Sequence, residues 1–164
     1  MKVKDVMHQA PVVACSPETN LAAAVDLLWT NDCGSLPVLK DELLVGMITD
    51  RDIAIALGTR NVRPSELTVG EVISHIGFTC APDDDVHSAL KTMRTHKVRR
   101  LPVLGRHGKL EGLLCINDVI LRAHRVAHKP TDVTYDDVVN TLKAIGEHRR
   151  PEMETRPAAM AAAV

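Results

Sequence analysis

Short apolar runs and apolar helix stripes follow one another along this chain in an order that occurs twice. Each half predicts strand, helix, strand, strand, helix, because uninterrupted apolar runs of about five residues are typical of buried strands and an i, i+4, i+7 spacing is typical of one helix face. The stripes expected to be buried are Leu21, Val25 and Leu28, then Val86, Leu90 and Met93. The expected strands are 11–15, 35–39 and 43–48, then 76–80, 100–104 and 110–115, and the closing helices are 50–57 and 117–128.

The two halves also share their residues in register. Leu36-Pro37-Val38-Leu39 recurs as Leu101-Pro102-Val103-Leu104, about 65 residues later. Gly46 to Asp52 recurs as Gly112 to Asp118. A fixed internal period indicates a duplicated unit folded against itself with pseudo-twofold symmetry. Any ligand is then expected in the cleft between the copies.

The period divides the chain into five parts. We expect a first repeat, a linker containing Pro64, a second repeat, a helical extension with the stripe Val138, Leu142 and Ile145, and a Pro- and Ala-rich tail that is predicted to be disordered. In that order the parts are 1–58, 59–68, 69–128, 129–150 and 151–164.

Composition narrows the function classes. Aromatic residues make up 2% of the 164 residues and the net charge is −1, so neither stacking platforms nor a basic field favours nucleic acid. No apolar run approaches the roughly 18 residues that span a bilayer, and the first residues lack the apolar stretch of a secretory signal. We therefore expect a cytoplasmic protein with reduced cysteines and with neither membrane nor nucleic acid as a partner.

The end of the strand at 43–48 carries the strongest candidate site. Thr49 is placed to cap the following helix, whose free N–H groups favour a phosphate. Asp52 lies one turn further on and can accept hydrogen bonds from two ribose hydroxyls. The same Thr-x-x-Asp spacing is also that of an ordinary capping box, which is the purely structural interpretation.

The second copy departs from this pattern. Cys115 replaces the threonine, while Asp118 is kept. Arg99 and Arg100 stand immediately before Leu101, where the first copy has Gly34-Ser35, and a guanidinium fork suits phosphate. The alternative is a solvated basic edge. The two sites are expected to differ, and the sequence leaves open which cleft the arginines serve.

The order of elements, the Leu-Pro-Val strand and the Gly-h-h-Thr-x-x-Asp strand end (h, apolar) together resemble the CBS domain over about residues 1–128. The resemblance implies an α/β fold of duplicated βαββα repeats forming a Bateman module, here with an extra C-terminal helix. It implies two clefts for AMP, ADP, ATP or S-adenosylmethionine, and a homodimer. It also implies that the base contacts apolar surfaces, which would be those around Val13, Ala14, Cys15, Leu36, Pro37 and Ile48. Pro102 is a further expected ligand contact.

We therefore expect a non-catalytic sensor of adenosine-containing ligands that requires no cofactor, since no catalytic constellation is legible. The alternative is an adaptor dimer with degenerate clefts that binds an unidentified protein target. A weaker possibility is metal or redox chemistry at Cys15 and Cys80, or at His124 and His128. No metal site is predicted, because neither pair comes with two further ligands.

Overall fold

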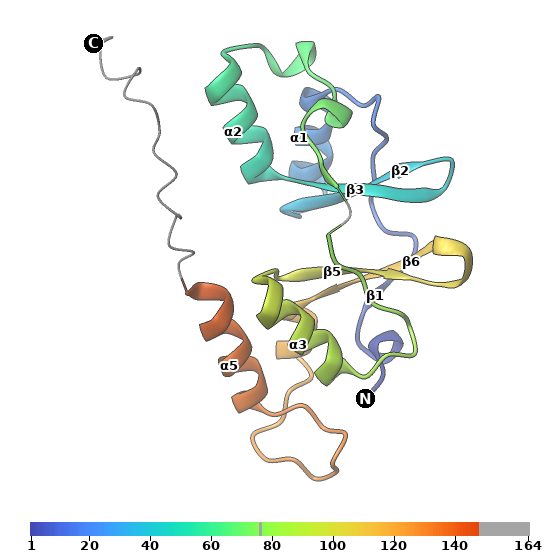
Figure 1. Ribbon diagram of the computed structural model, residues 1–164, viewed down its shortest axis with the longest axis vertical. Coiled ribbons are helices and arrows are strands. Elements are labelled where there is room, and N and C mark those ends of the chain that lie inside the picture. Colours follow the sequence, from blue (N-terminus) through green and yellow to red (C-terminus); the bar gives the residue numbers. More distant parts are fainter. Residues whose placement is uncertain (76, 148–164) are drawn as a thin grey trace.

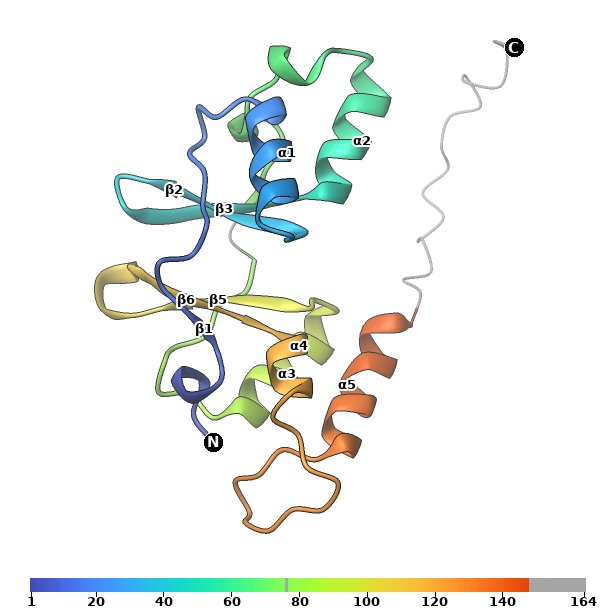
Figure 2. The same cartoon turned by 180° about the vertical axis from the view of Figure 1, so that it is seen from behind.

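A computed structural model describes residues 1–75 and 77–147. Two three-stranded antiparallel sheets face each other across the middle of the molecule, and the helices cover their outer sides (Figures 1 and 2). Lobe A contains the sheet β2-β3-β4 with α1 and α2, and lobe B contains β1-β6-β5 with α3, α4 and α5. The strands are β1 His8–Gln9, β2 Ser35–Lys40, β3 Leu43–Thr49, β4 Ser74–His75, β5 Arg100–Leu104 and β6 Leu110–Cys115. The α-helices are α1 Leu21–Thr30, α2 Asp50–Arg60, α3 Val86–His96, α4 Ile116–Ile120 and α5 Tyr135–Gly146.

The two lobes exchange their edge strands. The N-terminal strand β1 pairs with β6 of lobe B, and β4, which follows the first repeat, pairs back onto β3 of lobe A. Close backbone approach makes one repeated glycine necessary, because a Cβ on Gly112 would lie 2.6 Å from His8 O. The exchange ties the two lobes together, because each sheet includes an edge strand from outside its own repeat.

Each lobe has its own core of aliphatic side chains. Lobe A buries Leu21, Leu36, Val38 and Ile48, and lobe B buries the equivalent Val86, Leu101, Val103 and Leu114. The exchange extends to the cores. Val3 is fully buried in lobe B and Val69 in lobe A.

Two of the expected strands do not form as such. In 11–15 and in the described part of 76–80, only Cys15 and Cys80 pair, through single parallel bridges to Val38 and Val103. Cys15 N donates to Pro37 O and Leu39 N donates to Cys15 O, and residues 12–14 have no ladder partner. Of these two runs only Cys15 and Cys80 are buried; residues 12–14 are half-buried, and Pro11, Gly77 and Phe78 are exposed, so the expectation of buried strands is wrong here.

The helix expected over 117–128 ends at Ile120. Beyond it the chain turns back on itself, because His124 N donates to Val133 O and Tyr135 N donates to His124 O. Val133 is fully buried in the core of lobe B. Burial of this side chain therefore directs the chain into α5.

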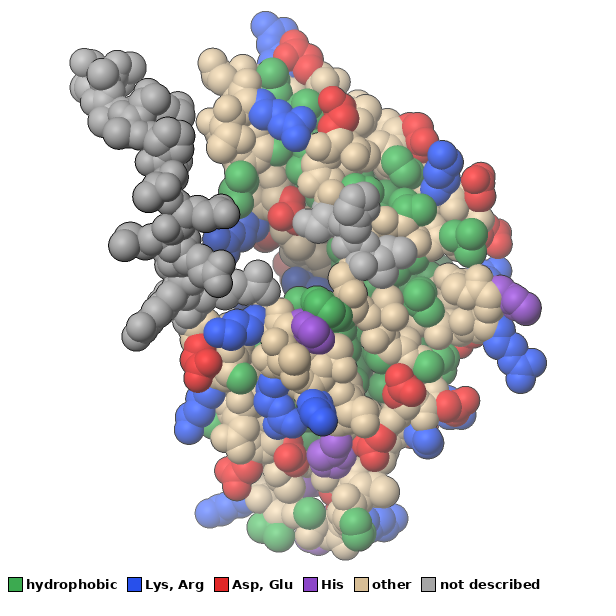
Figure 3. Space-filling view, viewed as in Figure 1, with side chains coloured by type: hydrophobic (Ala, Val, Ile, Leu, Met, Phe, Trp, Pro, Cys, Tyr) green, Lys and Arg blue, Asp and Glu red, His purple; other side chains and the backbone are tan. Residues whose placement is uncertain are grey.

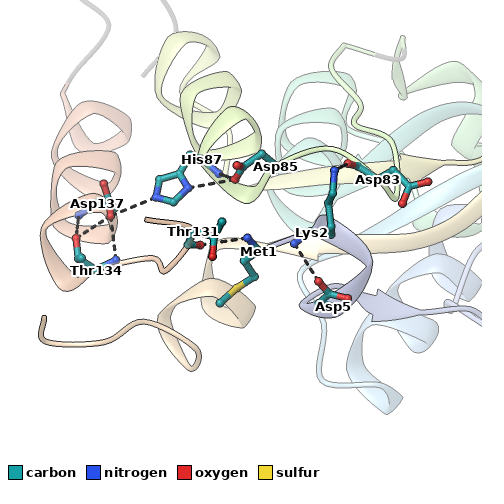
Figure 4. A network of polar contacts seen from close by, with 9 residues as sticks. All are labelled: Met1, Lys2, Asp5, Asp83, Asp85, His87, Thr131, Thr134 and Asp137. Atoms are coloured by element: carbon teal, nitrogen blue, oxygen red, sulfur yellow. Dashed lines mark hydrogen bonds and ion pairs between the residues drawn. The ribbon is translucent and has the colours of Figure 1, made fainter. Parts of the chain in front are cut away.

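Helix α5 packs on α3 and is joined to it by polar contacts (Figure 4). Thr134 and Asp137 form a capping box at its start, with Thr134 N and Oγ1 donating to Asp137 Oδ2 at 2.9 and 2.7 Å. His87 of α3 places Nε2 3.6 Å from Asp137 Oδ2 and Nδ1 3.1 Å from Asp85 Oδ1. The hydrogen bonds from Thr134 lower the pKa of Asp137.

Two predicted stripes are partly wrong. On α1, Leu21 and Leu28 are buried but Val25 is 43% exposed. On α5, Val138 and Thr141 are buried while Leu142 is 39% exposed, so the buried face is rotated from the predicted one. The stripe on α3 is confirmed, because α5 covers that helix and nothing in the described chain covers α1 in the same way.

Candidate functional site

Two cavities of similar size lie between the lobes. Cleft 1, of about 350 Å³, is at the start of α2, and its lining from lobe A includes Met47, Thr49, Asp50 and Arg51. Cleft 2, of about 370 Å³, is at the start of α4, and its lining from lobe B includes Leu113, Cys115, Ile116, Asn117 and Asp118. Both volumes lie in the range of about 300–1,000 Å³ that is common for small-molecule sites.

The clefts are built from equivalent positions of the two repeats. Gly77, Phe78 and Val98 line cleft 1, and the positions 65 residues earlier, Val12, Val13 and Cys33, line cleft 2. Each cleft therefore combines the strand–helix junction of one repeat with the other repeat's segment. Both clefts therefore lie between the two repeats, where the sequence predicts a ligand.

At cleft 1 the strand–helix junction is a complete capping box. Thr49 N and Oγ1 donate to Asp52 Oδ2 at 3.0 and 2.7 Å, and Asp52 N donates to Thr49 Oγ1 at 3.1 Å. Thr49 lines the cleft, whereas Asp52 is not among the lining residues. Within the described chain no hydrogen bond uses Asp52 Oδ1, so this oxygen could accept from a ligand.

At cleft 2 the strand–helix junction is held by fewer capping hydrogen bonds than at cleft 1. Cys115 N donates to Asp118 Oδ2 at 2.8 Å, but no side-chain hydrogen bond from Cys115 closes the cap. Burial raises the pKa of the Cys115 thiol, Asp118 raises it further, and Arg100 opposes both. The thiol is therefore neutral near pH 7, and Asp118, unlike Asp52, lies in the lining of its cleft.

Arg99 and Arg100 line both clefts. Arg100 pairs with Cys115 in the β5–β6 register and also reaches toward lobe A. A Cβ on Gly34 would lie 3.4 Å from Arg100 Nη2 and 3.3 Å from Asp50 Oδ2. The guanidinium of Arg100 thus lies between the junction of lobe B and the start of α2 in lobe A.

The other predicted contacts divide into lining residues and core residues. Val13 lines cleft 2 and Pro102 lines cleft 1. Leu36 and Ile48 are fully buried in the core of lobe A, and Cys15 and Pro37 are buried beside them, so these four support the cleft from behind.

The sequence reasoning missed Phe78 and Ser35. The ring of Phe78 lines cleft 1 and stacks on His96, with ring centroids 3.4 Å apart and planes 14° apart. The period itself was the available signal, because Phe78 occupies the position equivalent to Val13. Ser35 lines both clefts and is equivalent to Arg100.

The cysteines proposed for redox or metal chemistry belong to different lobes. Cys15 belongs to the core of lobe A and Cys80 to that of lobe B. Burial raises the pKa of Cys15 to about 11 and that of Cys80, which also feels Asp84, to about 12. Within residues 1–75 and 77–147 no group of three or more His, Cys, Asp or Glu side chains is arranged to hold a metal ion.

Charged side chains of both signs are interspersed over the described surface seen in Figure 3. No helix in the described part of the chain has both the length and the apolar character needed to cross a bilayer.

Sequence comparison identifies the repeats. The CBS domain profile matches residues 3–59 and again residues 69–125. The chain therefore belongs to the CBS-domain family and carries two CBS domains in tandem. The fold, with its additional helix α5, agrees with this assignment.

Similar proteins include stand-alone CBS proteins. The CBS domain-containing protein YhcV of Bacillus subtilis (strain 168) is 32% identical over 117 residues, which are 71% of this chain and 81% of YhcV. A crystal structure of Hypoxic Response Protein I with two coordinated zinc ions superposes with a TM-score of 0.68 at 28% identity, covering 76% of this chain and 100% of that one. A crystal structure of CBSX2 in complex with AMP, a protein of Arabidopsis thaliana, superposes at 0.64 and 26% identity, covering 73% and 93%.

Proposed function

We propose that this CBS pair is a non-catalytic regulatory module that binds an adenosine-containing ligand in cleft 1 and cleft 2. The observation that carries the proposal is the equivalence of the clefts, each of which joins the strand–helix junction of one repeat to a segment of the other. The AMP complex of CBSX2 supports the ligand class. AMP, ADP, ATP and S-adenosylmethionine are the candidates, and no permanent cofactor is required.

Cleft 1 offers a partner for each part of such a ligand. The guanidinium of Arg51 favours phosphate. Asp52 is not among the described lining residues, but its Oδ1 carries no hydrogen bond in the described chain, and we assign it to the ribose hydroxyls. Phe78 and Pro102 supply apolar surface for the base, and an aromatic face suits a purine.

A thermal-shift screen of the purified chain tests the proposal. AMP, ADP, ATP, S-adenosylmethionine and NAD are compared with CMP, which carries the same phosphate and ribose on a different base. A ligand at 100 times its dissociation constant should stabilise the fold by about 2.7 kcal/mol. Stabilisation by adenosine ligands and not by CMP supports the proposal, and no shift with any of them contradicts it.

A second candidate function, a dimeric adaptor with a protein target, is favoured by one surface. A groove between α1 and α2 is lined by apolar side chains including Val25, Leu28, Ile53 and Leu57, and Trp29 beside them is 85% exposed. Exposed apolar surface of this kind marks interaction sites. The groove shares Asp32 and Cys33 with cleft 2 and Gly34 and Asp50 with cleft 1, so a partner seated there would lie beside both clefts.

A further inference from the structure

The linings of the two clefts have three residues in common, Ser35, Arg99 and Arg100. Cleft 2 has no other Lys or Arg among its described lining residues, whereas cleft 1 also has Arg51. Acidic side chains lie in both clefts, Asp50 in cleft 1 and Asp32 and Asp118 in cleft 2. An anion in cleft 2 therefore depends on the same two arginines that face cleft 1.

The repeat explains why one arginine pair serves both clefts. Gly34 and Ser35 occupy the positions equivalent to Arg99 and Arg100. The small residues leave space that Arg100 enters, with Nη2 3.4 Å from the position of a Cβ on Gly34. Arginines at all four positions would place four guanidinium groups together, and like charges in a confined space repel.

The hydroxyl of Ser35 independently indicates that a ligand group binds beside Arg99 and Arg100. The residue is 5% exposed and its Oγ is the buried side-chain polar atom that has no hydrogen-bond partner in the described chain. A buried hydroxyl without a partner is costly, so such groups are rare and call for an explanation. Because Ser35 lines both clefts, a ligand oxygen in either one could accept its hydrogen bond.

We propose that Ser35, Arg99 and Arg100 form one anion subsite that the two clefts share. The proposal rests on the binding of adenosine ligands in the clefts and adds that phosphate groups compete for this subsite. A phosphate held from cleft 1 draws the arginines and the hydroxyl toward itself and places a negative charge beside cleft 2. Anionic nucleotides then bind the second cleft more weakly, whereas neutral adenosine fills both clefts without coupling.

Calorimetric titration of the full chain with AMP and with adenosine tests the shared subsite. Two AMP steps should differ by about fivefold or more, the lower end of typical coupling between sites. The clefts also differ in having Thr49 or Cys115 at the junction, and this difference alone could give the two AMP steps different affinities. To measure cleft 2 by itself, cleft 1 is filled by mutation. Gly77→Trp fills cleft 1, where a Cβ on Gly77 would have no heavy atom within 4 Å. In this variant, AMP should bind cleft 2 more tightly than in the second step of the wild type.

Two further variants and a control complete the test. Arg100→Ala and Ser35→Ala should weaken AMP binding and leave adenosine affinity unchanged, and both should reduce the gap between the two AMP steps. Ser35→Ala should not lower the melting temperature of the ligand-free chain, because it removes a hydroxyl that has no partner. Arg106→Ala, at an exposed arginine outside both clefts, should change none of these quantities.

The outcomes separate this inference from the proposed function. Adenosine binding together with two independent AMP sites, or a Gly77→Trp affinity equal to the second wild-type step, would overturn the shared subsite alone. If Gly77→Trp does not fold, the Arg100→Ala titration decides: an unchanged gap between the AMP steps overturns the inference. Absence of binding for both AMP and adenosine overturns the proposed function and the shared subsite with it.

Discussion

Val25 and Leu90 occupy equivalent positions on α1 and α3, yet Val25 is 43% exposed and Leu90 is 1% exposed. The exposed fractions differ because α5 packs on α3, whereas no equivalent helix of the described chain packs on α1. The duplicated sequence thus leaves one of its two helix faces open, and Trp29 lies on that open face. Exposed apolar surface of this kind is typical of interaction sites.

We predict that the open face of α1 and α2 forms a homodimer. Light scattering at micromolar concentration should give about twice the chain mass of 17.9 kDa. Trp29→Glu should shift the protein to the monomer, because a buried charge at a dimer interface is costly. Leu121→Glu is the matched control, since Leu121 is 82% exposed and lies outside the groove. A monomer at all concentrations, or a dimer that tolerates Trp29→Glu, would contradict the prediction.

Asp52→Ala should weaken binding of an adenosine ligand about ten- to a hundredfold. The expected loss corresponds to a charge-assisted hydrogen bond of roughly 1.5–3 kcal/mol. The same change also removes the acceptor for Thr49 N and Oγ1 in the capping box, which should lower the free energy of unfolding by about 1 kcal/mol.

Asp137→Ala separates these two effects. The Thr134–Asp137 box has almost the same geometry as Thr49–Asp52, with 2.9 and 2.7 Å against 3.0 and 2.7 Å, and lies outside both clefts. Calorimetry should show a large loss of affinity for Asp52→Ala and none for Asp137→Ala. Equal affinities in both variants would leave Asp52 as a cap only.

Acid should weaken the attachment of α5. Hydrogen bonds from Thr134 lower the pKa of Asp137 in the folded chain, so its contribution to stability is present above the unfolded value of about 3.9 and is lost as the pH falls through the folded value. Chemical denaturation of wild type and Asp137→Asn should therefore show a stability difference at pH 6 that fades below about pH 4. A difference that is constant with pH would show that the carboxylate charge does not contribute.

Cys15 and Cys80 should resist thiol reagents in the folded chain. Burial raises their pKa values to about 11 and 12, and the thiolate is the reactive form. Because the two residues lie in separate cores, hydrogen peroxide should not join them. Mass spectrometry of native protein after brief alkylation measures this, with unfolded protein as the control. Rapid modification of either residue, or a disulfide between them, would revive the redox interpretation.

The duplicated period was the strongest guide to the fold, because it depends on residues that the core requires in both copies. Leu36 and Leu101 of the repeated Leu-Pro-Val are both fully buried, at equivalent positions of the two lobes. The internal period did not predict the exchange of β1 and β4 between the lobes. Short edge strands such as His8–Gln9 carry little pattern of their own, and their partners lie far away in sequence.

The candidate site was predictable at the strand–helix junctions and much less so across the cleft. Thr49 and Asp118 follow from local spacing, and both line a cleft. The placement of Arg100 depends on how the two lobes face each other and on the small residues at Gly34 and Ser35, which are remote in sequence. Leu36 and Ile48 were expected at the ligand surface, but a continuous apolar run does not tell which side chains turn into the core.

A crystal structure of the full chain grown with AMP tests the central proposal most directly. We expect AMP in cleft 1 with its ribose hydroxyls within hydrogen-bond distance of Asp52 Oδ1, its base against Phe78, and its phosphate facing Ser35, Arg99 and Arg100. Clefts that stay free of AMP at a saturating concentration, or AMP bound only on the groove between α1 and α2, would contradict the proposal that the clefts are adenosine sites.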